Sequence, residues 1–237
     1  MQLTLEKMVE RLKDDCGENL LSVILYGSAA AGDYAGKKSD YNLMVIARSL
    51  NVSQLVQISK SAHPWVKQGN PPPLLFTLER LQRSSDVFPI EIADIKENHK
   101  VLFGDDPISG IVISYENLRL ELEHELKGKL IQLRERFLFT EGKPKLVEDL
   151  IVQTLSTFLV LFKNALRLYN EIPPVKKMEA LVELNKHISC DMELFEILDR
   201  LKQGEKLKDL DRIILFERYL KAVENVVDAV DKHLRQI

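Results

Sequence analysis

Hydrophobic residues in the first part of the chain follow two different spacings. In residues 3–13 and 50–65 they recur every three to four positions, which is the spacing of one face of a helix. Asn51 or Ser53 would supply the N-cap of the second helix. Elsewhere short apolar runs lie between glycines, prolines or polar residues, which is typical of buried strands. The strands predicted in this way are residues 20–26, 40–47, 74–78 and 88–95, and a short helix is predicted over residues 77–83.

The second part of the chain carries only the helical spacing. After a break at residues 104–107, apolar residues in steps of three and four predict a long helix. The members of this stripe are Leu118, Leu122, Leu126, Leu130, Leu133 and Phe137. Further helices are expected over residues 146–169, 178–187, 192–202 and 211–234. The pattern therefore predicts a helical bundle after an α/β part, and two domains, residues 1–108 and residues 109–237.

Charge and cysteine content narrow the class of protein. The formal net charge is −3, whereas a protein that coats DNA or RNA would carry a basic excess. We therefore expect no extended nucleic acid as a partner, although a small nucleotide needs only a local site. Cys16 and Cys190 are too far apart to indicate a disulfide framework or a zinc motif, which predicts a reduced, cytoplasmic protein. No apolar run approaches the roughly 18 residues of a membrane helix, and the N-terminus lacks the features of a signal peptide.

The turn after the first predicted strand has the composition of an anion site. Gly27 has no Cβ and lets the backbone approach a ligand closely. Ser28 would stand at the start of a helix, where backbone N–H groups and the positive end of the helix dipole favour an anion. Its hydroxyl can add a further hydrogen bond to a phosphate. Gly27 and Ser28 are therefore predicted to bind phosphate.

Polar side chains begin the next predicted strand. Asp40 and Asn42 would share one face, because side chains alternate along a strand, and Tyr41 would point away. We expect the two polar side chains to project beside the Gly27 turn, so that a cation and an anion can meet between them.

This arrangement resembles the nucleotidyltransferase superfamily, which includes the kanamycin-type aminoglycoside-modifying enzymes and the polymerase β-like enzymes. The family pattern is Gly-Ser after a strand, then Asp-x-Asp or Asp-x-Glu on the next strand, and a third carboxylate from a later strand. The resemblance covers about residues 20–105, and the helical part is similar in style to the C-terminal domain of the kanamycin-type enzymes. It implies an α+β fold with a mixed sheet, followed by an α-helical bundle domain.

The resemblance also implies a divalent metal site for Mg²⁺ or Mn²⁺. Asp40 matches the first acidic metal ligand, and Asn42 stands where the second acid is expected, so the motif is a degenerate Asp-x-Asn. A neutral amide oxygen can still coordinate a metal ion, but the loss of one negative charge weakens binding of a second ion most. Glu91 is the candidate third acid, as a metal ligand and as the base on the acceptor hydroxyl, although it could equally be a surface acid. Asp94 is interpreted as a helix cap.

Lysine and histidine are two further types of side chain that could bind a ligand. Lys163 lies between Phe162 and Asn164 on a largely apolar helix, where it either sits at the margin of the bundle or binds the triphosphate. The histidines show no paired spacing of metal ligands and are interpreted as surface or helix-margin residues. They are His63, His99, His124, His187 and His233.

Two functions of different classes remain open. In the first, the protein transfers a nucleoside monophosphate from a nucleoside triphosphate to a hydroxyl of a small molecule or protein, with Mg²⁺, and Asn42 impairs the reaction. In the second, it is a non-catalytic protein that binds nucleotide or a partner, and its helical half serves as a surface for a partner or a second copy. A third hypothesis places it in a toxin–antitoxin pair.

Overall fold

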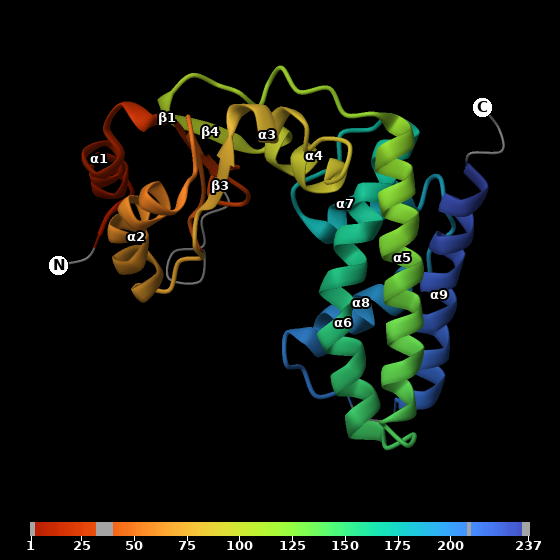
Figure 1. Ribbon diagram of the computed structural model, residues 1–237. Coiled ribbons are helices and arrows are strands. Elements are labelled where there is room, and N and C mark those ends of the chain that lie inside the picture. The colour runs from red at the N-terminus through yellow and green to blue at the C-terminus, as the bar shows by residue number, and fades with distance from the viewer. Residues whose placement is uncertain (1–2, 32–39, 208–209, 234–237) are drawn as a thin grey trace. The chain divides into compact units, whose positions relative to one another are not determined.

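The chain consists of two compact units. The computed structural model describes residues 3–31, 40–207 and 210–233 (Figure 1). The first unit is Met1–Leu118 and the second is Arg119–Ile237. The division lies ten residues beyond position 108, where the sequence pattern places it. It falls inside a helix, so the change of sequence character and the division of the chain occur at different residues.

A four-stranded mixed sheet forms the centre of the first unit. Its order is β3-β2-β1-β4, and β1 pairs antiparallel with both β2 and β4, while β2 and β3 are parallel. The strands are β1 (Leu20–Tyr26), β2 (Asn42–Ala47), β3 (Leu74–Thr77) and β4 (His99–Gly104). The mixed sheet in one unit and the helices of the other confirm the predicted fold class.

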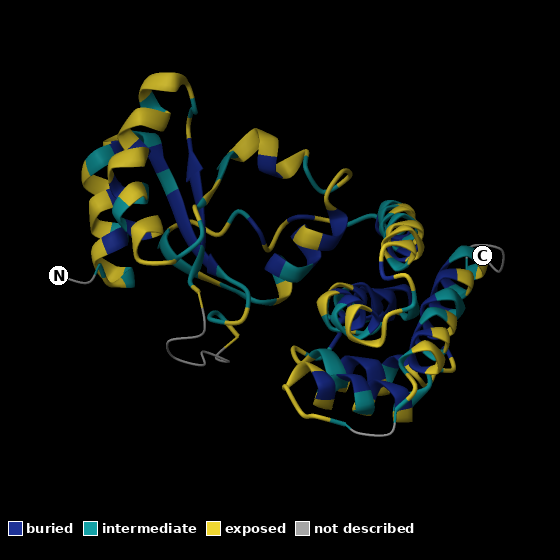
Figure 2. Ribbon diagram, turned by 90° about the horizontal axis from the view of Figure 1, so that it is seen from below, coloured by how far each residue is buried: buried dark blue, intermediate teal, exposed yellow. Residues whose placement is uncertain are grey.

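Helices cover both faces of this sheet. Val23 and Leu25 of β1 belong to the core under α1 (Leu5–Cys16) and α2 (Val52–Lys67). Ile24, between them, belongs to the core under α3 (Leu78–Gln82) and α4 (Pro89–Glu97). The buried residues lie on the inner sides of these helices (Figure 2). Alternate residues of one strand are therefore buried on opposite faces, which explains why β1 and β2 are continuously apolar.

Local sequence signals set the bounds of the first helices. The Thr4 hydroxyl accepts a hydrogen bond from the Lys7 N–H at the start of α1. At the start of α2, the Asn51 side chain accepts from the Gln54 N–H, and the Gln54 side chain accepts from the Asn51 N–H. This reciprocal capping box confirms the prediction that Asn51 caps the helix. A short 3₁₀ turn, η1 (Gly17–Asn19), connects α1 to β1.

The prediction of a fourth strand over residues 88–95 is wrong. Residues 88–95 are not a strand; they belong mostly to α4, which begins at Pro89, and the fourth strand is β4, ten residues further on. Ile90, Ile92 and Ile95 are all buried, so the segment carries apolar residues at both strand and helix spacings. Proline at the first helical position favours the helix, because its missing N–H has no partner there in any case.

Strand β4 approaches β1 closely at its end. Gly104 has a φ of +77°, and a Cβ added there would lie 1.9 Å from the carbonyl oxygen of Leu21. The buried Ser22 hydroxyl lies within hydrogen-bond distance of the carbonyl oxygens of Phe103 (3.0 Å) and Asp105 (2.7 Å). The pairing with β1 is irregular between Val23 and Ile24. Only glycine fits position 104, because both the backbone angle and the available space exclude a side chain.

The regular elements among the described residues of the second unit are all helices, joined by turns and loops, which confirms the predicted bundle. Its elements are α5 (Tyr115–Leu138, whose first turn lies in the first unit), α6 (Pro144–Ala165), η3 (Leu166–Tyr169), α7 (Lys177–Leu184), α8 (Met192–Lys202) and α9 (Arg212–His233). Its core is rich in aromatic residues: the Phe158 ring meets Tyr219 edge-on at 5.9 Å, and Phe162 meets Phe195 at 6.0 Å. The buried Tyr219 hydroxyl lies 3.2 Å from the Thr154 hydroxyl, so its polar end is satisfied inside the bundle. None of the helices in the described part of the chain is long and apolar enough to cross a membrane.

Candidate functional site

The turn at Gly27 is built as a tight backbone bend. β1 ends at Tyr26, and Gly27 adopts a φ of +78°, which a side chain would strain. The Gly27 N–H donates to the Asn98 carbonyl at 2.9 Å. The N–H groups of Ala30 and Ala31 donate back to the Gly27 carbonyl at 3.0 and 3.1 Å, so residues 28–31 form one helical turn. The predicted continuation into a helix lies outside the described residues.

This turn offers backbone donors to an anion. In a helical turn the N–H groups that precede the first internal hydrogen bond have no partner inside the turn. Here these are the groups of Ser28 and Ala29, since the internal bonds begin at Ala30. Ser28 is exposed, so its hydroxyl is accessible from solvent. The turn therefore has the geometry of an anion site.

Asn42 lies against the Gly27 turn. It is the first residue of β2 and the direct cross-strand neighbour of Tyr26. A Cβ at Gly27 would come within 3.2 Å of the Asn42 Nδ2 atom, so the amide of Asn42 occupies the space that glycine leaves open. The amide is half-buried and offers an oxygen to a cation or an NH₂ group to a phosphate.

Tyr41 points to the opposite side of the sheet from Asn42. Its ring packs against Trp65 of α2 with centroids 6.0 Å apart, and its N–H donates to the Asn70 side chain at 3.2 Å. Asn42 lies on the other face of β2, which continues with Met44. Asp40 is exposed and lies two residues before the start of β2, so its position on the face of Asn42 stays a prediction.

Glu91 does not come from a strand. It lies in the first turn of α4 and is exposed, whereas the sequence pattern places it on a strand over residues 88–95. The strand that does run parallel to β2 is β3, and the residues before it, Asn70 to Pro73, contain no carboxylate. A third acid on a neighbouring strand is therefore missing from this edge of the sheet, and Glu91 could contribute only from α4.

The donor set at this edge fits one magnesium ion rather than two. Within residues 3–31, 40–207 and 210–233 there is no group of three or more His, Cys, Asp or Glu side chains that could hold a metal ion. Asp40 provides one carboxylate, and Asn42 provides a neutral oxygen. Mg²⁺ is often held by one or two protein oxygens together with water and substrate phosphates. The site thus suits an ion that is bound jointly with a phosphate.

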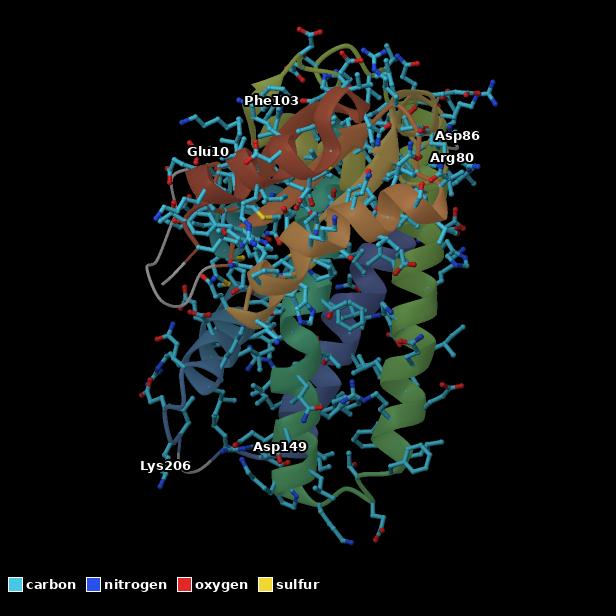
Figure 3. The ribbon with its side chains drawn as sticks, turned by 60° about the vertical axis from the view of Figure 1, so that its left-hand side comes forward. Glu10, Arg80, Asp86, Phe103, Asp149 and Lys206 are labelled. Carbon is cyan, nitrogen blue, oxygen red and sulfur yellow. The ribbon has the colours of Figure 1, made fainter. Side chains whose placement is uncertain are left out.

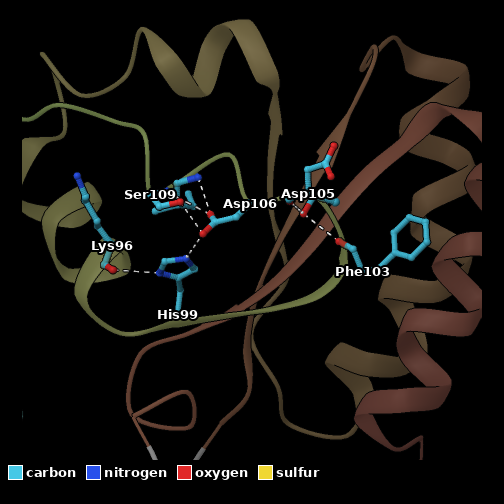
Figure 4. Close-up of polar contacts among 8 residues, drawn as sticks. Lys96, His99, Phe103, Asp105, Asp106 and Ser109 are labelled. Atoms are coloured by element: carbon cyan, nitrogen blue, oxygen red, sulfur yellow. Dashed lines mark hydrogen bonds and ion pairs between the residues drawn. The ribbon is translucent and has the colours of Figure 1, made fainter.

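His99, which the sequence pattern places at the surface or at a helix margin, instead lies largely buried on a strand at the same edge. His99 begins β4 and is the direct cross-strand neighbour of Tyr26, on the opposite side from Asn42. Its Nδ1 lies 3.0 Å from the Lys96 carbonyl, and its Nε2 lies 3.1 Å from Oδ2 of Asp106 (Figure 4). The sequence pattern does not indicate this position, because it predicts no strand over residues 99–104.

Asp106 holds the segment after β4 in place through hydrogen bonds. It accepts hydrogen bonds from the Ser109 hydroxyl at 2.7 Å and from the N–H groups of Ile108 and Ser109 at 2.9 and 3.2 Å (Figure 4). Burial acts to raise the pKa of Asp106, but these bonds and the one to His99 outweigh burial and lower the pKa to about 2. We call His99, Asp106 and Ser109 the β4 clasp. Since Ser109 donates to Asp106 and does not contact the histidine in this arrangement, the clasp is structural and is no Ser-His-Asp triad.

Lys163 belongs to a group of three lysines in the second unit. Lys177 of α7 is half-buried, and its pKa is lowered first by burial and then by the charges of Lys202 and Lys163. The Lys202 ammonium donates to the Ser156 hydroxyl. The charges of Lys163 and Lys202 therefore act on Lys177. Phosphate binding by Lys163 stays a prediction.

The fold is that of a known nucleotidyltransferase. Spectinomycin adenyltransferase AAD(9) from Enterococcus faecialis, solved with ATP and spectinomycin, matches with a TM-score of 0.57 at 12% sequence identity. The match covers 97% of this chain and 100% of that one, which confirms the fold inferred from the sequence resemblance. A toxin–antitoxin structure with AMP-PNP matches 50% of this chain and 92% of its own at 19% identity, with a TM-score of 0.34. No protein-family model and no curated protein matches the sequence.

Proposed function

We propose that this protein binds a nucleoside triphosphate at the Gly27 turn and transfers its nucleoside monophosphate to a hydroxyl group of a small molecule or protein. The observation that carries the proposal is the contact between the Asn42 amide and the space above Gly27. It brings Asn42, the first residue of β2, to the backbone donors of the turn, and Asp40 precedes Asn42 by two residues. The fold shared with AAD(9), whose structure was determined with ATP, supports a nucleotide as the ligand.

Each residue of the site has a separate task in this proposal. The N–H groups of Ser28 and Ala29 and the Ser28 hydroxyl bind phosphate oxygens, which fixes the nucleotide beside the strand. Asp40 and the oxygen of Asn42 would hold Mg²⁺, which would neutralise charge on the triphosphate and the leaving pyrophosphate. Glu91 is the proposed base that accepts the proton of the acceptor hydroxyl, acting from α4.

Binding without transfer is the second candidate function. It is favoured by two observations: residue 42 is an amide, and no acid lies on the segment that leads into β3 beside it. With one negative charge fewer than the family pattern, the site would retain a single metal–nucleotide complex but stabilise the reacting phosphate poorly. The protein would then act as a nucleotide-dependent binding protein.

The two functions are separated by measuring binding and product together. Titration calorimetry with each nucleoside triphosphate and Mg²⁺ or Mn²⁺ measures affinity, and pyrophosphate release measures transfer to an added or endogenous acceptor. We expect Asp40→Ala to weaken metal-dependent binding at least about tenfold, equivalent to about 1.4 kcal/mol. Asp86→Ala, a change at an exposed acid between α3 and α4, is the matched control and should bind as the original protein does.

Asn42→Asp and Glu91→Gln sharpen the interpretation. If residue 42 faces the metal, Asn42→Asp should strengthen Mg²⁺ binding and raise any pyrophosphate release, because it restores the missing charge. Glu91→Gln should lower release and leave affinity unchanged if Glu91 is the base. Failure of every nucleotide to bind with either metal would overturn both candidate functions, and binding without release in Asn42→Asp would support the second.

A further inference from the structure

One end of the helical unit carries a cluster of exposed apolar side chains. The connection from α5 to α6 and the first turns of α6 and α9 meet there (Figure 1). A Cβ added at Gly142 would lie 3.8 Å from Cδ1 of Ile213, and Nε of Arg212 donates to Oε2 of Glu148 at 2.7 Å, so these elements are in contact. We call this cluster the apolar tip. Its members are Leu138, Phe139, Leu146, Ile213 and Ile214.

The apolar tip exposes more hydrophobic surface than scattered surface residues would. Phe139 is 80% exposed and Leu138 76% exposed, and the other members are between 42% and 56% exposed. Together they expose the equivalent of about three whole side chains, or roughly 500 Å². Patches of about this size on a monomer are often functional, because removing apolar surface from water lowers the free energy of the system. The residues just inside the tip are well packed, since the Phe137 and Phe216 rings stack at 4.3 Å.

Charges of both signs surround the apolar tip. Lys143 pairs with Glu141 at 2.9 Å, and Lys145 pairs with Asp149 at 3.0 Å. Asp149 lies toward this end of the helices (Figure 3). A partner of a single charge sign would meet as much repulsion as attraction on this rim. A second copy of this surface carries the same two kinds of charge. Each charge on one copy can therefore lie opposite a charge of the other sign on the second copy, as a self-complementary two-fold interface requires.

We propose that the apolar tip is the interface through which two copies of this chain form a homodimer. A standard interface buries about 800 Å² on each partner, and homodimer interfaces are roughly 65% apolar. An apolar centre of about 500 Å² inside a charged rim matches both values. The proposal does not depend on nucleotide binding, since none of its residues belongs to the proposed nucleotide site.

Sedimentation velocity of the full chain at low and high micromolar concentration tests the proposal. The original protein should move from one mass of 27.2 kDa toward twice that mass as concentration rises. Phe139→Glu, which places a charge at the centre of the interface, should raise the dissociation constant at least about a hundredfold, since burying an unpaired charge costs several kcal/mol. Because Phe139 is exposed in the monomer, the variant should keep the circular dichroism spectrum and melting temperature of the monomer.

Ile172→Glu is the matched control, because Ile172 is 82% exposed in the same unit but lies between η3 and α7, outside the apolar tip. It should dimerise as the original protein does. A protein that stays at 27.2 kDa at every concentration overturns the proposal. A dimer that Phe139→Glu and Ile172→Glu leave equally intact overturns it as well, because the contact must then lie elsewhere.

Discussion

At position 27 a side chain would meet two separate obstacles. The φ of +78° strains any residue except glycine, and a Cβ would press on the Asn42 amide at 3.2 Å. Position 17 presents only the first obstacle, since Gly17 has a φ of +53° and nothing within 4 Å of a Cβ. Comparing the two glycines therefore separates backbone strain from the contact with Asn42.

Gly27→Ala should cost about 1–2 kcal/mol of stability from backbone strain, and Gly17→Ala should cost at least as much, because Gly17 combines its positive φ with a ψ of −134°. Only Gly27→Ala should also weaken nucleotide binding, by about tenfold or more, because it displaces the side chain of Asn42. Chemical unfolding and calorimetry measure the two effects. Equal nucleotide affinity in both variants would contradict the assignment of the Gly27 turn as the phosphate site.

The β4 clasp links a helix, a strand and the segment that follows them. His99 reaches the last turn of α4 through the Lys96 carbonyl, and Asp106 reaches forward to Ser109. Ile108 and Ile111, in the segment so held, belong to the core under α3 and α4. The clasp thus positions apolar side chains as well as polar ones.

The stability that Asp106 contributes should depend on pH. Its folded pKa of about 2 lies below the usual 3.8, so the contribution is complete above about pH 4 and disappears as the pH falls toward 2. Because the side chain is one-third exposed, we expect only about 1 kcal/mol. Asp106→Asn should lower the free energy of unfolding by that amount at neutral pH and by nothing near pH 2. Urea unfolding across this range measures the difference, and a constant difference would rule out the charge of Asp106 as its source.

Elements with strong local signals could be predicted from the sequence, and the rest required long-range contacts. β1 and the cap of α2 follow from a compact apolar run and from the Asn51 and Gln54 pair. α4 and β4 could not be assigned, because the three isoleucines of α4 fit either spacing and β4 is defined by pairing with β1. The pattern of Gly27, Asp40 and Asn42 could be recognised because these residues are close in sequence. His99 could not, because only the pairing of β4 with β1 brings it to this edge.

Each of the two units has its own core, so the predicted nucleotide ligands of each unit can be tested by separate substitutions. The first unit buries its sheet between two pairs of helices, and the second buries the aromatic residues of α6, α8 and α9. Lys163 is the single predicted ligand that belongs to the second unit. Its contribution therefore decides whether the helical unit takes part in binding.

Lys163→Ala should weaken nucleoside triphosphate binding about three- to tenfold if Lys163 binds phosphate, because it removes one cation from the site. It should also raise the pKa of Lys177, because the positive charge of Lys163 lowers that pKa. Calorimetry and the pH dependence of lysine labelling measure the two effects. Lys186→Ala is the control, because Lys186 is 62% exposed and paired with Glu183. Unchanged affinity with a raised Lys177 pKa would show that Lys163 has only an electrostatic role within the bundle.

The pairing of β1 with β4 has a consequence for biosynthesis. The Ser22 hydroxyl contacts the Phe103 carbonyl across 81 residues of sequence, so the central strand cannot gain its second neighbour until β4 has left the ribosome. Until then β1 keeps one unpaired edge, and the core that contains Ile24 and Met44 lacks Ile108 and Ile111, which follow β4 in the sequence. A nascent chain stalled before residue 104 is thus the form of this protein that most needs a chaperone.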